Sequence, residues 1–407
     1  MLSLGCTAEP DPADCPNGYA MDKASGLCLE SGDTATDTGD ADADGDADSD
    51  TDADGDSDAD SDADGDTDAD SDTDTGSNPE YTVCDDGVAP YSDIQDAVDD
   101  AKDGDTIYVC AGTYDRVEIE GMELTLIGDG RDTTFIDGGS HTAMIVTEAS
   151  LTLSGFALTG AAESGARPAS ALQVTSSTVA GRLLRVHDGH SAPNFDGKAV
   201  STYLSITTWD DIVFDGNSVA TAFAAGGGSV VMRHATFIDN LPQTDGSGGR
   251  ILILETDSFE LGNILAYGNV AGTVDALAEF HGSGVGWLYN AVIYGNTAGG
   301  RTMLVHGNAN TIENSIIAHN DSGGISAPDG APLQYNDVWN NGSGSSDALG
   351  GTNINLDPKF TSPETGDFTL KTGFSPAIDA GNPLSGYNDL DGTRNDLGIY
   401  GGPAGAW

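Results

Sequence analysis

The sequence predicts an all-β solenoid, a fold in which a short unit repeats along one axis. A seven-residue frame recurs, with a polar first residue, alternating apolar residues and a closing Gly-Asn or similar pair. Its clearest copies are residues 263–269 (NILAYGN), 290–296 (NAVIYGN) and 314–320 (NSIIAHN), and weaker copies begin at Asp211, His234 and Asn336. Successive copies start 23, 29, 27, 24 and 22 residues apart, a period typical of solenoids. The 56 glycines and only 7% aromatic residues suit short strands joined by tight turns.

Composition restricts the partners of the chain. Its 407 residues include 67 acidic but only 14 basic side chains, for a net charge of −53. Such a field repels phosphate backbones and anionic membranes, which argues against nucleic acid as a partner. No apolar run is long enough to span a bilayer. We expect a monomer.

Residues 1–6 (MLSLGC) resemble the end of a bacterial lipoprotein signal. The resemblance implies that Cys6 is lipidated, that the protein is extracellular or on the outer-membrane surface, and that it meets the membrane only through this anchor. The cysteine count agrees, because two disulfides, Cys15–Cys28 within a small segment at 7–32 and Cys84–Cys110 further on, would leave Cys6 over. The alternative is an ordinary N-terminus with a free thiol.

Residues 33–78 form an Asp-rich linker in which every second residue from 40 to 74 is Asp. Like charges at this density cannot pack, so we expect a disordered, extended stalk. Asp40, Asp42 and Asp44, followed by Gly45, resemble the start of an EF-hand loop, but the closing Glu and the flanking helices are missing. The sequence requires no cofactor, and loose calcium binding to these aspartates is the one candidate.

The folded body is expected to open with a short amphipathic helix, because Ile94, Val98 and Ala101 are spaced i, i+4, i+7. A turn at 103–105 and strands at 106–110 and 117–119 follow. This segment, YSDIQDAVDDAKDGDTIYVCAGTY, resembles the opening of right-handed parallel β-helix proteins of the pectate-lyase and pectin-methylesterase type. The resemblance implies a helix that caps the apolar stack and a Cys84–Cys110 disulfide that joins this cap to the first coil.

The β-helix is expected to span residues 79–352 in about nine or ten rungs, each with three short strands. The first frame position should fall at a sharp turn between the second and third strands, where Asn tolerates a left-handed backbone. In this fold stacked asparagines form hydrogen-bonded ladders, which predicts one ladder of Asn263, Asn290, Asn314 and Asn336. Asp211 and His234 occupy the same position upstream and are therefore interpreted as structural.

Residues 353–407 are predicted to be a C-terminal cap. SPAIDAGNP at 375–383 and DLDGTRNDLGIYGGP at 389–403 resemble a segment of bacterial surface β-helix proteins in the group called choice-of-anchor Q. The tail should shield the last rung, because an exposed rung is an open edge that would pair with another chain.

Catalytic residues known from β-helix enzymes are present only in fragments. Asp210-Asp211 and Gly189-His190 resemble pieces of the polygalacturonase set, but Gly-His-Gly and Arg-x-Lys are missing. For a lyase, the candidates for the catalytic base are Arg182, Arg185, Arg233, Arg250 and Arg301. The frame places Glu255, His281 and His306 near the end of the first sheet on successive rungs, about 5 Å apart. This column is a candidate for acid–base work or divalent-ion binding, and a polar, solvent-facing column is the alternative.

Three functions fit these features. The first is a surface-anchored protein that binds polysaccharide, surface glycan, matrix or a cell without catalysis, and the incomplete catalytic sets favour it. The second is a polysaccharide lyase or glycoside hydrolase that acts on uronic-acid polymers in the groove. The third is a structural spacer without a ligand.

Overall fold

The computed structural model describes residues 19–21, 28–30, 81–85, 87–160, 170–191, 196–281, 284–342 and 350–406. The chain divides into two units, residues 1–72 and 73–407. In the first unit, β1 (Tyr19–Met21) and β2 (Cys28–Glu30) pair antiparallel. The predicted lipidation at Cys6, the Cys15–Cys28 disulfide and the calcium candidates Asp40, Asp42 and Asp44 fall outside the described side chains. Within the described residues, no helix has the length and apolar character needed to cross a bilayer.

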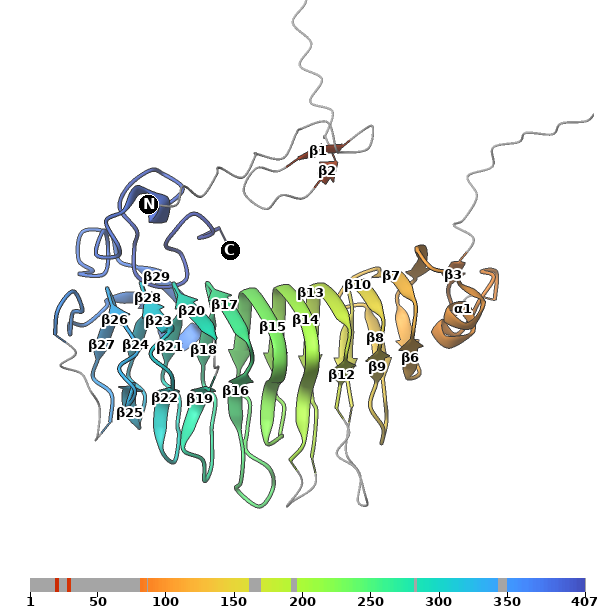
Figure 1. Ribbon diagram of the computed structural model, residues 1–407, viewed down its shortest axis with the longest axis horizontal. Coiled ribbons are helices and arrows are strands. Elements are labelled where there is room, and N and C mark those ends of the chain that lie inside the picture. Colours follow the sequence, from red (N-terminus) through yellow and green to blue (C-terminus); the bar gives the residue numbers. More distant parts are fainter. Residues whose placement is uncertain are drawn as a thin grey trace, which may run out of the picture. The chain divides into compact units, whose positions relative to one another are not determined.

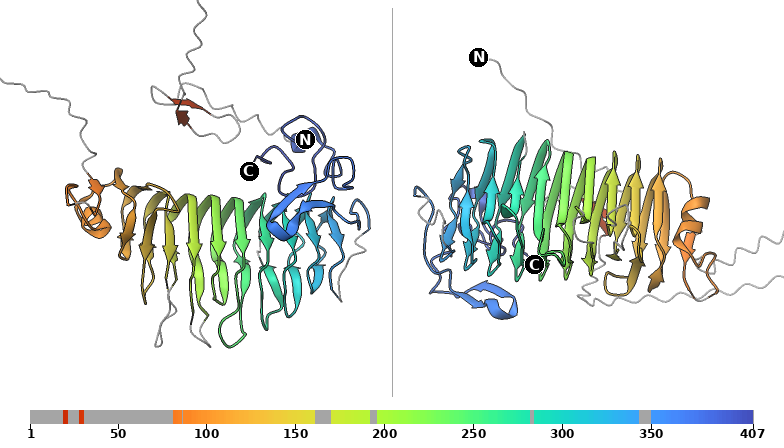
Figure 2. Two further views of the ribbon diagram at one scale, coloured as in Figure 1. Left: turned by 180° about the vertical axis from the view of Figure 1, so that it is seen from behind. Right: turned by 90° about the horizontal axis from the view of Figure 1, so that it is seen from below.

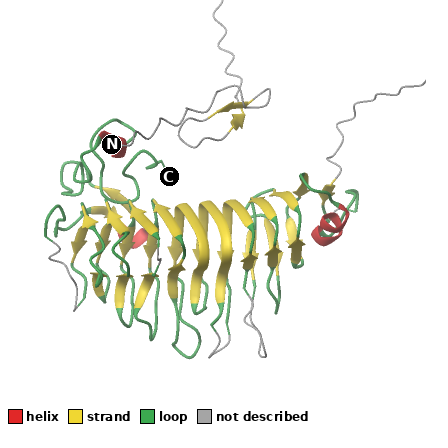
Figure 3. Cartoon of the chain, in the orientation of Figure 1, coloured by secondary structure: helices red, strands yellow, loops and turns green. Residues whose placement is uncertain are grey.

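The second unit opens with β3 (Tyr81–Val83) and α1 (Ile94–Asp100), which closes one end of the stack (Figures 1 and 3). Asp93 caps the helix, because its carboxylate accepts the backbone N–H of Gln95 at 2.7 Å. The predicted apolar face is present, with Ile94 and Val98 buried. A disulfide joins Cys84, which follows β3, to Cys110, which follows β4, with their Cα atoms 5.0 Å apart.

Parallel strand pairings define three long sheets, which we call A, B and C. Sheet A consists of β6 (Val117–Glu120), β9 (Met144–Thr147), β12 (Leu172–Thr175), the first parts of β14 (Lys198–Asp215) and β15 (Thr221–Ile238), β16 (Arg250–Glu255), β19 (Ala276–Phe280), β22 (Arg301–Val305) and β25 (Gly323–Ser326). Sheet B consists of β4 (Asp105–Val109), β7 (Glu123–Gly128), β10 (Ser150–Ser154), the first part of β13 (Thr178–His187), the middle of β14 and β15, β17 (Ser258–Gly262), β20 (Val285–Tyr289), β23 (Asn310–Glu313) and β26 (Leu333–Gln334).

Sheet C consists of β5 (Gly112–Tyr114), β8 (Thr134–Asp137), β11 (Ala157–Thr159), the last parts of β13, β14 and β15, β18 (Leu265–Tyr267), β21 (Val292–Tyr294), β24 (Ile316–Ala318) and β27 (Asp337–Trp339). The chain visits B, C and A in turn, and each strand pairs with its equivalents in the neighbouring turns (Figure 2). The fold is therefore a right-handed parallel β-helix, as predicted. The solenoid has about eight turns, slightly fewer than the expected nine or ten rungs.

The core lies between the three sheets, where alternate side chains of every strand stack on the same position of the next turn. One inward column of sheet B consists of Leu126, Leu153, Gly181, Trp209, Met232, Leu261, Leu288 and Ile312. Trp209 is fully buried. It fits because its neighbour is Gly181, where a Cβ atom would lie 2.5 Å from the indole ring.

The structure contains an asparagine ladder, but it lies at the last position of the frame rather than the first. Side-chain Nδ2–Oδ1 hydrogen bonds of 2.8–2.9 Å join its successive members, which are Asn217, Asn240, Asn269, Asn296, Asn320 and Asn341. The predicted ladder of Asn263, Asn290, Asn314 and Asn336 is therefore wrong. The first three share a column and a left-handed backbone (φ 52–54°), but their side chains contact the C-terminal tail instead of one another.

Asn336 lies one position outside the column of Asn263, Asn290 and Asn314. Sheet C pairs Ile316 with Asp337, so Asn336 is level with Ser315 and accepts the Ser315 backbone N–H at 3.1 Å. Tyr335 occupies the left-handed turn position instead, with φ 54°. The last rung is therefore shifted by one residue relative to the frame.

The C-terminal tail covers the last rung only at its start and then folds back along the outer face of sheet C (Figure 1). Ile354 pairs with β27, donating its N–H to Asn336 at 2.8 Å. The tail then forms a hairpin of β28 (Phe360–Ser362) and β29 (Asp367–Leu370), with short 3-10 helices η2 (Pro363–Thr365) and η3 (Ser385–Tyr387). A second apolar cluster joins it to sheet C and comprises Leu265, Val292, Ile316, Ala318, Phe360, Phe368, Ala377, Leu397 and Ile399.

Candidate functional site

The predicted column of Glu255, His281 and His306 exists at the end of sheet A. The strand register pairs the residues that precede them, Leu254 with Phe280 and Phe280 with Val305. The imidazoles of His281 and His306 stack with their centroids 4.7 Å apart and their planes 18° from parallel. Glu255 is exposed at the end of β16.

Each imidazole of this column has a carboxylate of its own. His281 Nε2 lies 3.0 Å from Glu279 Oε2, and His306 Nδ1 lies 3.1 Å from Asp329 Oδ2. Burial alone would raise the pKa of Glu279, but hydrogen bonds from Arg250 (2.7 Å) and His281 lower it overall. The two histidines therefore do not converge on one point. In the described ranges, no group of three or more His, Cys, Asp or Glu side chains could hold a metal ion.

A second polar site, which we call the corner pocket, lies where sheet B turns into sheet C. The turn residues Leu183, Asp211 and His234 have left-handed backbones with φ of 51–52°. The residue before each of them faces outward, because it alternates with the buried column of sheet B. The cavity measures about 350 Å³ and is lined by Arg131, Arg182, Asp210, Asp211, Val213, His234, Thr236 and Ala406.

His234 is the most constrained side chain of the corner pocket. Its Nδ1 lies 2.8 Å from Asp210 Oδ1, and its Nε2 lies 2.8 Å from the carbonyl oxygen of Ala404 in the tail. Both partners are acceptors, so both ring nitrogens must donate and the ring is an imidazolium. The hydrogen bond between the pair raises the pKa of His234 and lowers that of Asp210, which fits this ionic state.

Two arginines complete the electrostatics of the corner pocket. Arg131 donates to Asp211 Oδ1 at 2.5 Å, whereas Arg182 approaches Asp210 only to 4.0 Å and keeps 63% of its side chain exposed. Two guanidinium groups and one imidazolium face two carboxylates, so the pocket has a net charge of +1. In a chain of net charge −53, a locally positive cavity is a preferred position for an anion.

An aromatic surface continues from the corner pocket along sheet B. Arg182, Asp210, Arg233, Gly262 and Tyr289 are successive members of one outward column. Arg233 pairs with Glu260 at 2.7 Å, and the Tyr289 hydroxyl donates to the same carboxylate at 3.0 Å.

Trp287 extends this surface, with its ring centroid 4.5 Å from that of Tyr289 and 5.9 Å from that of Tyr387 in the tail. The indole N–H donates to Glu313 at 2.8 Å, which fixes the ring. A cationic cavity thus adjoins partly exposed aromatic faces.

The sequence reasoning named four residues of the corner pocket, Arg182, Asp210, Asp211 and His234, without recognising the site. It counted Asp210-Asp211 as a fragment and interpreted Asp211 and His234 as structural because they occupy the turn position. The structure shows that the turn position does not exclude a role, because its side chains face outward. The available signal was the position before each turn, where Arg182, Asp210 and Arg233 recur in register.

No protein-family model and no curated protein matches the chain. Among solved structures, it is similar to the pectate lyase Pel9A (12% identity, TM-score 0.40, covering 75% of this chain and 89% of that one). It is also similar to the pectin methylesterase PemA from Erwinia chrysanthemi (12%, 0.38, 72% and 99%) and to the pectin methylesterase from carrot (16%, 0.33, 72% and 92%). These likenesses concern the fold alone.

Proposed function

We propose that the protein binds an acidic polysaccharide through the corner pocket and the adjoining aromatic surface, without cleaving it. The net positive cavity on a strongly acidic chain supports this function. A guanidinium group binds a carboxylate in a planar, two-pronged geometry, and aromatic faces pack against the apolar faces of sugar rings. Arg182 is the group best placed to meet a uronate, because it is exposed and its carboxylate partner lies 4.0 Å away.

The test measures binding of the full chain to polygalacturonate, pectin and alginate, with neutral dextran as reference. Pectin belongs in the panel because the neighbours' names refer to it. Arg182→Gln should weaken binding about tenfold, the loss of one charge-assisted contact worth about 1.4 kcal/mol. The control is Arg116→Gln, since Arg116 pairs with Glu118 away from the corner pocket. Equal binding to dextran, or equal weakening by both variants, would contradict the proposal.

A second candidate function is cleavage of the same polymer. The observation that favours it is the Asp210–His234 pair, in which an ionised carboxylate lies beside an imidazolium whose Nε2–H, once released from the Ala404 carbonyl, could serve as a general acid. Release of reducing or unsaturated ends by the wild-type chain would establish turnover. Asp210→Asn and His234→Gln should then abolish turnover, while Arg116→Gln leaves it intact.

We further propose that the protein acts outside the cell and is attached to its surface through a lipid on Cys6. Mass spectrometry of the protein purified from membranes of its host would show the acyl chains on Cys6, and an unmodified thiol there would contradict the anchor. The resemblance of residues 375–403 to surface β-helix proteins supports the same location. Loose calcium binding at Asp40, Asp42 and Asp44 is a separate proposal, which calcium titration of Asp→Asn variants tests.

A further inference from the structure

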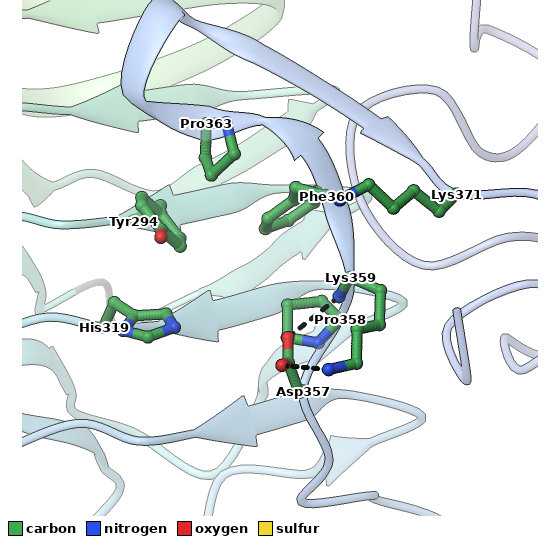
Figure 4. Close-up of a pocket in the computed structure, with 8 residues that line it drawn as sticks. All are labelled: Tyr294, His319, Asp357, Pro358, Lys359, Phe360, Pro363 and Lys371. Carbon is green, nitrogen blue, oxygen red and sulfur yellow. Dashed lines mark hydrogen bonds and ion pairs between the residues drawn. The ribbon is translucent and has the colours of Figure 1, made fainter. Parts of the chain in front are cut away.

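A second cavity, which we call the hairpin pocket, lies between the outer face of sheet C and the tail hairpin. It measures about 210 Å³. At about 30 Å³ per water molecule, this space equals roughly seven waters, which suits a ligand of monosaccharide size. The pocket is lined by Tyr294, His319, Asp357, Pro358, Lys359, Phe360, Pro363 and Lys371 (Figure 4).

The charge of the hairpin pocket is unusual for this protein. Two of the five lysines in the chain line it, at the open end of one hairpin, where Lys359 precedes β28 and Lys371 follows β29. The Lys371 backbone N–H donates to the Lys359 carbonyl at 3.0 Å. Lys359 Nζ is neutralised by Asp357 at 2.6 Å. In the described part of the chain, Lys371 has no ion pair, and Figure 4 shows its side chain reaching toward Phe360. The residues that line the pocket therefore carry a net charge of +1, one positive charge for an anion.

The opposite wall supplies an aromatic face and a hydrogen-bond donor. The Tyr294 ring packs edge-to-face on Phe360 at 5.7 Å and lies 5.0 Å from the His319 ring, which fixes its orientation. His319 Nδ1 lies 3.0 Å from the side-chain amide nitrogen of Asn340, which can only donate. Nδ1 is therefore the acceptor and Nε2 carries the hydrogen. The imidazole points toward Pro358 and Asp357 in Figure 4, so this donor faces the cavity.

We propose that the hairpin pocket binds a single hexuronate, a pyranose with one carboxylate. The Lys371 ammonium would pair with the carboxylate, the Tyr294 and Phe360 rings would pack on the sugar, and His319 Nε2–H and Asp357 would bond hydroxyl groups. Only the choice of a sugar acid rests on the proposed function. The hairpin pocket lies on sheet C, whereas the aromatic surface lies on sheet B, and the two share no residue. The hairpin pocket would therefore act as a separate site.

Calorimetric titration of the full chain with galacturonate, galactose and inorganic sulfate tests this site. Galacturonate should bind, and Lys371→Gln should weaken it at least fivefold. Arg182→Gln should leave galacturonate binding unchanged while it weakens binding of the polymer. The two proposed sites can therefore be disproved separately. Lys102→Gln is the matched surface control, and unchanged melting temperatures exclude misfolding. Three results would each overturn the proposal. They are equal binding of galactose, displacement of galacturonate by an equal concentration of sulfate, and no galacturonate binding at concentrations up to about 20 mM.

Discussion

Replacing Asp337 by Asn should stabilise the protein, and more so as the pH rises. Asp337 begins β27 and is completely buried under the tail. One carboxylate oxygen accepts the Leu356 N–H at 3.1 Å, and the other has no hydrogen-bond partner among the described residues. Burial raises the pKa of this carboxyl group from 3.8 to about 7. The folded protein therefore favours its neutral form.

The sign and size of the effect follow from the two pKa values. A carboxyl group whose pKa is raised on folding contributes its full stability below pH 3.8, and this contribution is lost as the pH rises to about 7. The difference of about 3 pKa units corresponds to about 4 kcal/mol at 1.36 kcal/mol per unit, an upper bound because the tail can relax. Asn keeps the shape and carries no charge. Asp337→Asn should therefore match the wild type at pH 4 and gain up to this amount at pH 8.

Thermal melts of both proteins at pH 4, 6 and 8 measure this difference. The exposed Asp115 provides the control, since Asp115→Asn should leave the pH dependence of the wild type unchanged. A difference between Asp337→Asn and wild type that stays constant from pH 4 to pH 8 would show that Asp337 is not the group that titrates.

Three further predictions concern packing and hydrogen bonds. Asn269→Ala should cost about 2–4 kcal/mol, because it leaves buried groups on both neighbouring rungs unpaired, whereas Asn308→Ala at an exposed position should cost under 0.5 kcal/mol in denaturant titrations. Gly181→Ala should cost about 1–3 kcal/mol in the same titrations, because the added methyl group meets the Trp209 ring; an unchanged midpoint would contradict the packing. His234→Gln should destabilise the tail by about 1–2 kcal/mol at pH 6 and less at pH 8, measured by hydrogen exchange, and a pH-independent effect would refute the imidazolium.

The column of Glu255, His281 and His306 shows how far the sequence carries a site prediction. A frame of fixed period sets which residues are level on successive rungs, and the stacked imidazoles agree with it. It does not show which carboxylate each side chain meets, because Glu279 and Asp329 come from other positions of the turn. The corner pocket was missed for the same reason, since Arg131 and Ala406 lie far from the frame that supplies Asp210.

The fold was predictable because it depends on local sequence. A parallel β-helix repeats one local pattern in which strand alternation and turn residues agree at every rung. The asparagine ladder marks the limit of that agreement. Both Asn263 and Asn269 recur with the frame, and residue identity alone cannot decide which column faces its own neighbours. The left-handed backbone at Asn263 turns its side chain outward to the tail. The side chain of Asn269 instead donates to Asn296 on the next rung.

Three titratable groups that contact the tail or lie within it, Asp337, His234 and Asp389, share one direction of pH dependence. Burial raises the pKa of Asp337 to about 7 and that of Asp389 to about 6, and each contribution to stability is lost as the pH rises through these values. The pKa of His234 is also raised, so its bond to Ala404 is complete at acidic pH and weakens as the ring loses its proton. Asp210 has the opposite sign, because its lowered pKa keeps it ionised until the pH falls below its usual range. The tail is therefore held most firmly in mildly acidic solution, and because Ala406 lines the corner pocket, the shape of that pocket depends on the same titrations.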